Sequence, residues 1–162
     1  MLGWKMMEAK SSNEDLVGKA AYAMNAFYER TSELYHDVAR SLGLSDSAFD
    51  ILYALYAKDG QRQSELCKTS MMPKQTLASS VRKLEEQGLV RVKSEGRKVS
   101  RVFLTAAGGE CAKRTIAPVM QAEVDAVTAL PREVLEHLPE TLDNYLDALD
   151  QGFRTLREEQ GR

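Results

Sequence analysis

Two cysteines, four prolines and no apolar run of membrane length limit what this chain of 162 residues can be. Cys67 and Cys111 stand far apart, so we expect neither a disulfide framework nor a cysteine metal site. The first residues, MLGWKMMEAKSSNEDL, lack the apolar core of a signal peptide, and no later stretch could cross a bilayer. We therefore expect a protein of the reducing cytoplasm without a membrane partner.

Signatures of catalysis are also missing. The two histidines, His36 and His137, lack a companion cluster of metal ligands, which favours structural or surface roles. The Gly108-Gly109 pair is not followed by the lysine and hydroxyl residue of a phosphate-binding loop. No arrangement of Ser, His and Asp or of paired carboxylates can be argued from the spacing. The sequence therefore predicts no catalytic residues, no metal and no cofactor.

Charge is distributed unevenly along the chain. The formal net charge of -2 would, if uniform, argue against nucleic acid as a partner. Residues 60–105, however, hold ten lysines or arginines and four acids, a net charge of +6, and the remainder nets -8. A basic middle between acidic ends is typical of a module that binds a polyanion. The alternative is an ordinary solvated face, which the helix pattern in the same segment makes less favourable.

Periodicity predicts a helix-rich chain around a small αα–ββ centre. Apolar residues recur every three or four positions in a long stretch that ends near Gly43 and in a shorter one from Ser45 to Asp59-Gly60. Further helices are expected over 63–69 and from Pro73 to Gln87, with Gly88 suited to the left-handed end position. Alternating apolar and basic residues over 89–93 and 101–104 predict a hairpin.

The C-terminal third is again helical by its pattern. Thr105 is a good capping residue for a helix that runs through residue 127, and Pro118 is expected to bend it. Residues 131–137 predict a short helical piece, and Pro139 is expected to restart the pattern. The last apolar stripe comprises Leu142, Tyr145, Leu146, Leu149, Phe153 and Leu156.

The helix from Pro73 to Gln87 has the two faces that a DNA-reading helix needs. With 100° between successive residues, Leu77, Val81 and Leu84 fall within one narrow wedge, the expected buried back. Amide, hydroxyl and guanidinium side chains can pair with base edges, and a lysine near a helix N-terminus suits a phosphate. We expect base contacts from Gln75, Ser79 and Arg82, and backbone contacts from Lys74, Thr76 and Lys83. For each residue alone, an ordinary solvent-facing role is at least as probable.

The hairpin tip is the second candidate surface for DNA. Arg97 and Lys98, flanked by Lys93 and Arg101, would place positive charge beside the duplex, where a narrow minor groove attracts it. A charged tip that only keeps a sheet edge soluble is the alternative. Its position after a polar-faced helix favours a DNA-binding wing.

Several short motifs make the resemblance specific. Leu44-Ser45, Glu65-Leu66, the K-Q-T-L of residues 74–77, the K-L-E-E-Q-G-L-V of residues 83–90 and the R-V-F-L-T-x-x-G of residues 101–108 resemble the MarR family of bacterial transcriptional regulators. The motifs cover roughly residues 44–108, and the flanking helices are similar to the family's layout.

The resemblance implies a fold and a function. The fold would be mainly α with a small β-hairpin wing: a winged helix-turn-helix with long N- and C-terminal dimerisation helices. Such proteins are homodimers that bind palindromic double-stranded DNA, and many release it when a small, often phenolic or anionic, effector binds. The implied segments are 1–10, a flexible N-terminus; 11–43, an N-terminal dimerisation helix; 44–105, the DNA-binding domain; and 106–162, C-terminal helices that complete the dimerisation region.

The sequence departs from the family pattern at three places. In the wing, Gly96 takes the place of a usual Asp and Lys98 that of a usual Arg, so the acid that helps hold wing to body is missing. Ser79 stands where the family often has Arg, so a different base preference is expected. Pro73 replaces a frequent helix-starting Asp.

Aromatic residues suggest where an effector would bind. Helices 11–43 and 45–59 are rich in tyrosine and phenylalanine, which more often form core or interface than a pocket. The family layout nevertheless points to a ligand pocket at Tyr22, Tyr28, Phe49 and Tyr53. Some relatives sense oxidants through cysteine, but Cys67 is more consistent with a small buried residue.

The most favoured function is a ligand-responsive transcriptional regulator, expected to be a repressor, that binds its operator as a homodimer. A winged-helix module that docks an acidic protein partner is one alternative. A DNA-binding architectural protein without an effector is another. Salt-sensitive duplex binding that is lost in a Gln75/Arg82 double variant would separate the first alternative from the regulator.

Overall fold

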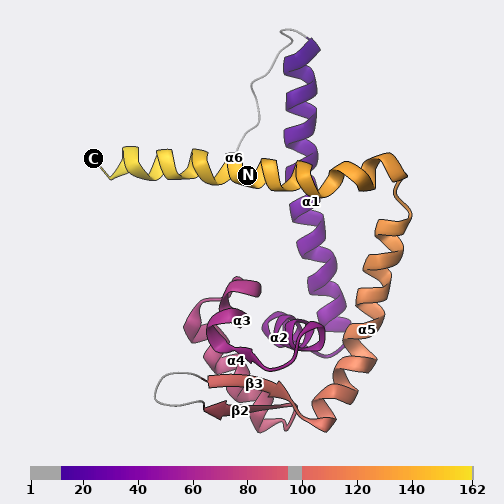
Figure 1. The fold of residues 1–162 in the computed structure, drawn as a ribbon, viewed down its shortest axis with the longest axis vertical. Coiled ribbons are helices and arrows are strands. Elements are labelled where there is room, and N and C mark those ends of the chain that lie inside the picture. Colours follow the sequence, from indigo (N-terminus) through magenta and orange to yellow (C-terminus); the bar gives the residue numbers. More distant parts are fainter. Residues whose placement is uncertain (1–11, 95–99, 162) are drawn as a thin grey trace. The chain divides into compact units, whose positions relative to one another are not determined.

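The computed structural model describes residues 12–94 and 100–161. The expected flexible segment 1–10 and the tip residues Arg97 and Lys98 lie outside these ranges. The described helices and strands follow in the order α1 Ser12–Ser41, α2 Asp46–Ala57, β1 Gln61–Arg62, α3 Gln63–Thr69, α4 Lys74–Glu86, β2 Val90–Ser94, β3 Ser100–Leu104, α5 Ala106–Thr128 and α6 Arg132–Gln160 (Figure 1). The mainly helical fold with a hairpin wing is confirmed.

The chain forms two compact units, one ending at Ile116 and the other beginning at Ala117. α5 starts in the first unit and ends in the second. The first unit contains the helices α1 to α4 and the sheet, and Figure 1 shows α2, α3 and α4 gathered beside the strands.

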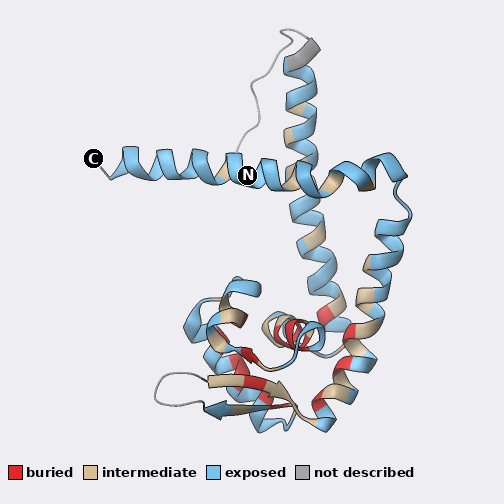
Figure 2. Ribbon diagram, viewed as in Figure 1, coloured by how far each residue is buried: buried red, intermediate tan, exposed pale blue. Residues whose placement is uncertain are grey.

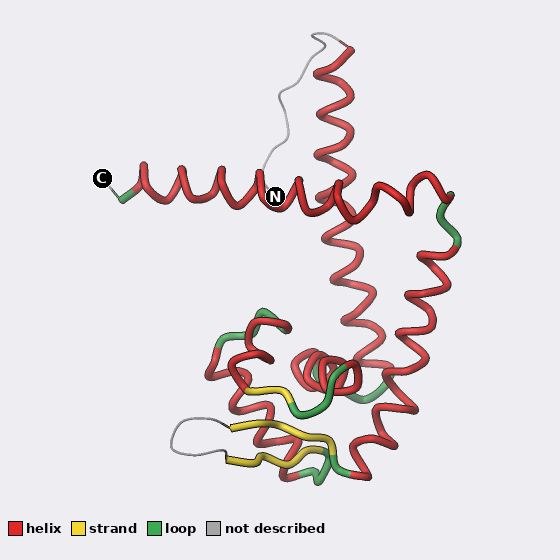
Figure 3. The backbone as a smooth tube through the Cα atoms, viewed as in Figure 1, coloured by secondary structure: helices red, strands yellow, loops and turns green. Residues whose placement is uncertain are grey.

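The sheet is antiparallel and has the strand order β1-β3-β2. β2 and β3 pair along their full length, with Val92 opposite Val102 and Lys93 opposite Arg101. The two-residue β1 pairs with the other edge of β3 through Gln61 opposite Val102 (Figure 3). β1 was not predicted, because two residues are too few to show a period of two.

The core lies in the first unit and joins α2, α3, α4, the sheet and the start of α5. Its large, fully buried side chains are Ile51, Leu52, Leu55, Leu66, Leu77, Leu84, Ile116, Val81, Val90 and Val102. Figure 2 shows the buried residues concentrated in these elements. The buried polar side chain of Gln61 is satisfied, because its amide donates to the backbone oxygens of Ala54 and Lys58 at 2.7 and 3.0 Å.

The second unit corrects one prediction. Residues 132–160 form the single helix α6, which continues through Pro139 instead of restarting there. A proline inside a helix costs about 3 kcal/mol, so neighbouring turns must offset it. The same helix carries exposed ion pairs four residues apart, Arg132 with Glu136 before the proline and Arg154 with Asp150 further along.

No residue of α6 is buried within the chain. Three residues of its apolar stripe, Leu146, Phe153 and Leu156, are more than half exposed. α1 likewise exposes large apolar side chains, among them Leu16, Val17, Tyr22, Phe27, Tyr28 and Leu34. Both helices therefore present apolar surface of the kind that marks an interaction site.

Candidate nucleic-acid interface

α4 has the two faces that its sequence predicts. Leu77, Val81 and Leu84 are 1, 2 and 1% exposed and anchor the helix on the core. Ser80 is also buried, and its hydroxyl donates to the Ser47 hydroxyl of α2 at 2.9 Å. All six residues expected to touch DNA on this helix are exposed, namely Lys74, Gln75, Thr76, Ser79, Arg82 and Lys83.

The ends of α4 are set by backbone chemistry. Pro73 occupies the N-cap position, where its missing N–H leaves no donor unpaired. At the other end Gly88 has φ +71°, and the next amide, of Leu89, donates to Leu84 O at 2.9 Å. In the turn before α4, Met71 has φ +49° and is 92% exposed. A left-handed methionine stores about 1–3 kcal/mol of strain, which marks the α3–α4 turn as a special position.

Two side chains of the polar face have internal partners. The Ser79 hydroxyl donates to the backbone oxygen of Thr76 at 2.9 Å, so the lone pairs of its oxygen face outward as acceptors. Arg82 Nε donates to Glu86 Oε1 at 3.0 Å, one turn further along the helix. The face therefore presents an ordered set of groups that can donate to and accept from base edges.

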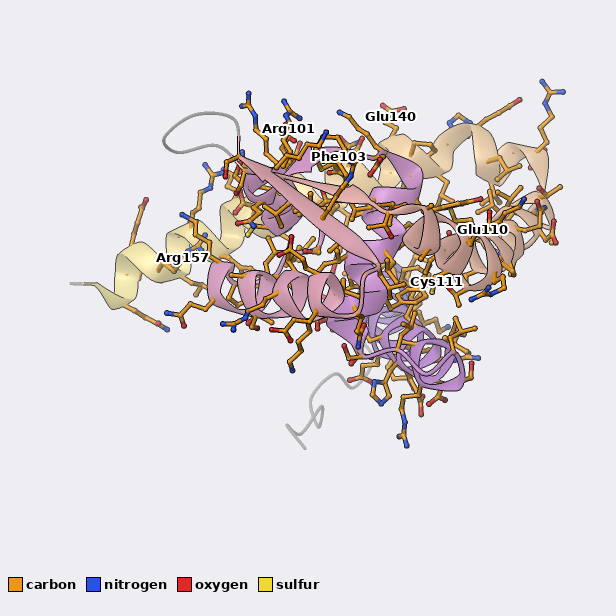
Figure 4. All side chains as sticks on the ribbon, turned by 90° about the horizontal axis from the view of Figure 1, so that it is seen from below. Arg101, Phe103, Glu110, Cys111, Glu140 and Arg157 are labelled. Atoms are coloured by element: carbon orange, nitrogen blue, oxygen red, sulfur yellow. The ribbon has the colours of Figure 1, made fainter. Side chains whose placement is uncertain are left out.

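The wing strands carry cations on their outer side. The Arg91 guanidinium and the Lys93 ammonium each lie 5.4 Å from the centre of the Phe103 ring. Arg101 and Phe103 project from the same side of β3 (Figure 4), and Arg101 Nη1 donates to Gly60 O at 2.8 Å. Arg91 was not among the predicted site residues, although its spacing of two from Lys93 on a strand was a usable signal.

A cleft of about 290 Å³ opens beside the first turn of α4. It is lined by Arg62, Gln63, Ser64, Cys67, Lys74, Leu77 and Ser100. Two cationic side chains and two hydroxyls on one small cleft suit a phosphate. Of these residues only Lys74 was predicted to contact DNA. Apart from Leu77 of α4, the others come from α3, β1 and the start of β3, which meet only in the fold.

The carboxylate of Glu65 lies at the start of α3, beside residues that line the cleft. The Arg62 amide donates to Glu65 Oε2 at 2.7 Å. This hydrogen bond, followed by the nearby charges of Arg101, Arg62 and Lys58, holds the pKa of Glu65 below its usual value. Glu65 therefore stays ionised, accepts the hydrogen bond of an amide at the start of α3 and partly offsets the positive charge of the nearby basic side chains.

The expected ligand-pocket residues fall into two places. Phe49 is buried between Tyr35 and Tyr53, with ring centroids 6.2 and 6.0 Å apart. Tyr22 and Tyr28 are 74 and 73% exposed on α1. At 1.5 Å per residue they lie about 20 and 10 Å along the helix axis from Tyr35. The structure thus brings together Phe49 and Tyr53, with Tyr35, and places Tyr22 and Tyr28 elsewhere on the first unit.

Charged groups lie beside this aromatic cluster. His36 Nδ1 is 3.0 Å from both carboxylate oxygens of Asp46 and links α1 to the start of α2. Asp50 is half-buried, and desolvation, together with the charge of Asp46, raises its pKa.

Other chemistry finds little support in the described part of the chain. Among residues 12–94 and 100–161, no group of three or more His, Cys, Asp or Glu side chains could hold a metal ion. Both cysteines are free and half-buried, and Cys67, expected to be a small buried residue, lines the cleft. No helix within these ranges has the length and apolar character needed to cross a membrane.

The comparisons with known proteins agree with this geometry. The model of the MarR family matches residues 42–98. A MarR-family transcriptional regulator from Silicibacter pomeroyi is 26% identical, with a TM-score of 0.69 over 85% of this chain and 94% of its own. No curated protein matches the chain.

Two other solved structures show the same fold at lower identity. The MepR–DNA complex of Staphylococcus aureus is 19% identical, with a TM-score of 0.65 over 80% of this chain and 96% of its own. NadR in complex with 4-hydroxyphenylacetate is 17% identical, with a TM-score of 0.60 over 87% of this chain and 96% of its own.

Proposed function

We propose that this chain, whose residues 42–98 match the model of the MarR family of transcriptional regulators, represses transcription by binding a palindromic operator as a homodimer. The observation that carries this proposal is the bare polar face of α4. Six residues able to contact DNA stand exposed on a helix whose back is held by Leu77, Val81 and Leu84. A helix placed in this way can enter the major groove and still keep its position.

Base contacts are assigned to the middle of the exposed face. Gln75, Ser79 and Arg82 point away from the core. The amide of glutamine matches the edge of adenine, the guanidinium of arginine matches that of guanine, and the hydroxyl of serine can pair with either. Lys74, Thr76 and Lys83 flank them and are assigned to the DNA backbone. The fold of a DNA-bound relative, MepR, supports the docking of this surface on a duplex.

Backbone phosphates are expected at two further places. The cleft beside α4 offers Arg62, Ser64 and Lys74 around a space large enough for a phosphate. Arg91 and Lys93 line the wing, and the family resemblance adds Arg97 and Lys98 at its tip. Several phosphate contacts make affinity fall steeply as salt rises.

A homodimer explains the exposed apolar faces of α1 and α6. Leu34 on α1 and Leu146 and Phe153 on α6 are each more than half exposed in a single chain. A second copy would cover such surface symmetrically and would present two α4 helices about 10 bp apart on a palindrome.

An effector is the remaining part of the proposal. Tyr35, Phe49 and Tyr53 form an aromatic cluster between α1 and α2, and NadR, of similar fold, binds 4-hydroxyphenylacetate. We assign a small aromatic ligand to this cluster, with Tyr22 and Tyr28 of α1 as further candidates. Gel shifts across a panel of aromatic acids would reveal it as ligand-dependent release of DNA; binding unmoved by every compound would contradict it.

The experiment that tests the DNA-reading role compares two alanine variants on operator and random duplexes. Arg82→Ala is expected to weaken operator binding by about 1–3 kcal/mol and to blur preference at one base pair. Lys74→Ala should weaken binding to both duplexes similarly, because it removes a phosphate contact. Equal losses on both duplexes for Arg82→Ala would contradict base reading, and a strong difference between duplexes for Lys74→Ala would contradict its phosphate role.

A further inference from the structure

An acidic side chain points in the same direction as the surface assigned to DNA and lies one turn beyond Arg82 on α4. With Leu77 at 0° on a helical wheel, Glu86 falls near 180°, between the bearings of Arg82 and Ser79. It is exposed at the C-terminal end of α4. A carboxylate at this place repels a phosphate backbone, so its presence calls for a physical reason.

The neighbouring acids have structural partners. Glu65 accepts the Arg62 amide at 2.7 Å, and Glu85 Oε1 accepts the Val92 amide at 3.0 Å, which ties α4 to β2. Glu86 instead accepts from Arg82 Nε at 3.0 Å, with the two side chains 63 and 81% exposed. An ion pair this exposed contributes little to stability, so folding alone does not account for it.

The geometry of the pair suits base recognition. The contact engages Nε, while the guanidinium carries two more nitrogens, Nη1 and Nη2, and is planar. A pair of such donors matches the O6 and N7 acceptors of guanine. The hydrogen bond to Nε favours one orientation of the guanidinium, and the carboxylate charge opposes the phosphates that would otherwise attract Arg82.

We propose that Glu86 is a positioning residue that aims Arg82 at a base and penalises contact with the backbone. The inference rests on the proposed DNA-binding function and adds a specificity device to it. Glu86 therefore has opposite effects on the two affinities. It strengthens operator binding through Arg82 and weakens binding to random DNA through its own charge. A merely structural role would change both affinities in the same direction.

The test measures the affinity of Glu86→Ala for operator and random duplexes at one salt concentration. Operator affinity is expected to fall about threefold to tenfold, while random-duplex affinity rises about twofold. Preference should relax at the same base pair that Arg82→Ala blurs. Glu86→Gln, which keeps an acceptor oxygen without the charge, should retain most of the base preference while binding random DNA more tightly.

Two controls separate this effect from charge and folding. Glu110→Ala removes one exposed acid from the first turns of α5, which is not assigned to DNA, and should leave the ratio of operator to random affinity unchanged. In an Arg82→Ala background, Glu86→Ala should change both affinities equally, because the residue to be positioned is gone. Circular dichroism melts of all variants check that the fold is retained.

Different results would contradict the positioning role of Glu86 and the proposed DNA-binding function. If Glu86→Ala leaves the affinity ratio unchanged, or lowers both affinities alike, the positioning role is wrong while Arg82 can still read a base. If the unaltered protein binds no duplex, the proposed function itself fails.

Discussion

Two neighbouring glycines of α5 sit in opposite environments. A Cβ at Gly108 would lie 1.8 Å from the backbone oxygen of Leu89, whereas a Cβ at Gly109 would meet no atom within 4 Å. The close approach lets Thr105 join three segments: its hydroxyl donates to Gly88 O at 2.6 Å and accepts the Gly108 amide at 2.9 Å. The start of α5 is therefore locked to the junction of α4 and β2.

Gly108→Ala should destabilise the protein strongly. The new methyl would overlap a backbone oxygen that cannot move without displacing β2, so we expect a loss of about 3 kcal/mol or more. Gly109→Ala is the matched control and should stabilise the protein by about 0.5–1 kcal/mol, because alanine favours the helix. Urea unfolding measures both, and similar stabilities of the two variants would contradict the close contact.

Asp50 should make stability depend on pH. Its pKa is raised above 3.8 by desolvation and by Asp46, so the folded state favours the protonated form. Its contribution is therefore unfavourable at pH 7 and is relieved as pH falls through the raised pKa. Asp50→Asn should raise the Tm at pH 7. The expected gain in the free energy of unfolding is less than about 1 kcal/mol, because the carboxyl group is only half-buried. A gain in Tm that does not shrink on acidification would contradict this.

At the scale of elements, α4, the helix proposed to read DNA, was the most predictable part of the fold. The wedge of Leu77, Val81 and Leu84, with Pro73 before the helix and Gly88 after it, predicted α4 and its exposed face from local patterns alone. α6 was less predictable because Pro139 usually ends or kinks a helix, and no local signal showed that the helix continues through it.

The candidate site was predictable only where its residues share one element. The α4 residues follow from a single helical wheel, but Arg62, Ser64 and Ser100 meet Lys74 through tertiary packing. Phe49 and Tyr53 lie one turn apart on the same helix, so the sequence alone places them side by side. The contact of Phe49 with Tyr35 depends instead on how α1 packs against α2. Sequence periodicity reports which face a residue occupies and not which other element faces it.

For the whole molecule, the basic charge and the exposed apolar surface lie in different parts of the chain, which suggests separate roles for them. The basic segment contains α3, α4 and the wing strands, and the long helices α1 and α6 expose apolar stripes. A monomer would leave these stripes in water, and large exposed apolar patches usually mark interaction sites. Assembly of two copies and DNA binding are therefore expected to be coupled.

Phe153→Asp tests this coupling. Phe153 is 52% exposed in the apolar stripe of α6, and a carboxylate buried at a dimer interface would be strongly unfavourable. We expect sedimentation to show a monomer and affinity for the palindrome to fall by at least about tenfold. Gln151→Asp adds the same charge on the opposite side of α6 and should do neither. A Phe153→Asp protein that stays dimeric would rule out this stripe as the interface.

Selection of bound sequences from a pool of random duplexes tests the central claim most directly, because it reports base reading and symmetry together. We predict enrichment of one palindrome whose half-sites lie about 10 bp apart, with preference at one pair per half-site relaxing in Arg82→Ala. Recovery of DNA without sequence preference, or of a single unrepeated half-site, would contradict the account.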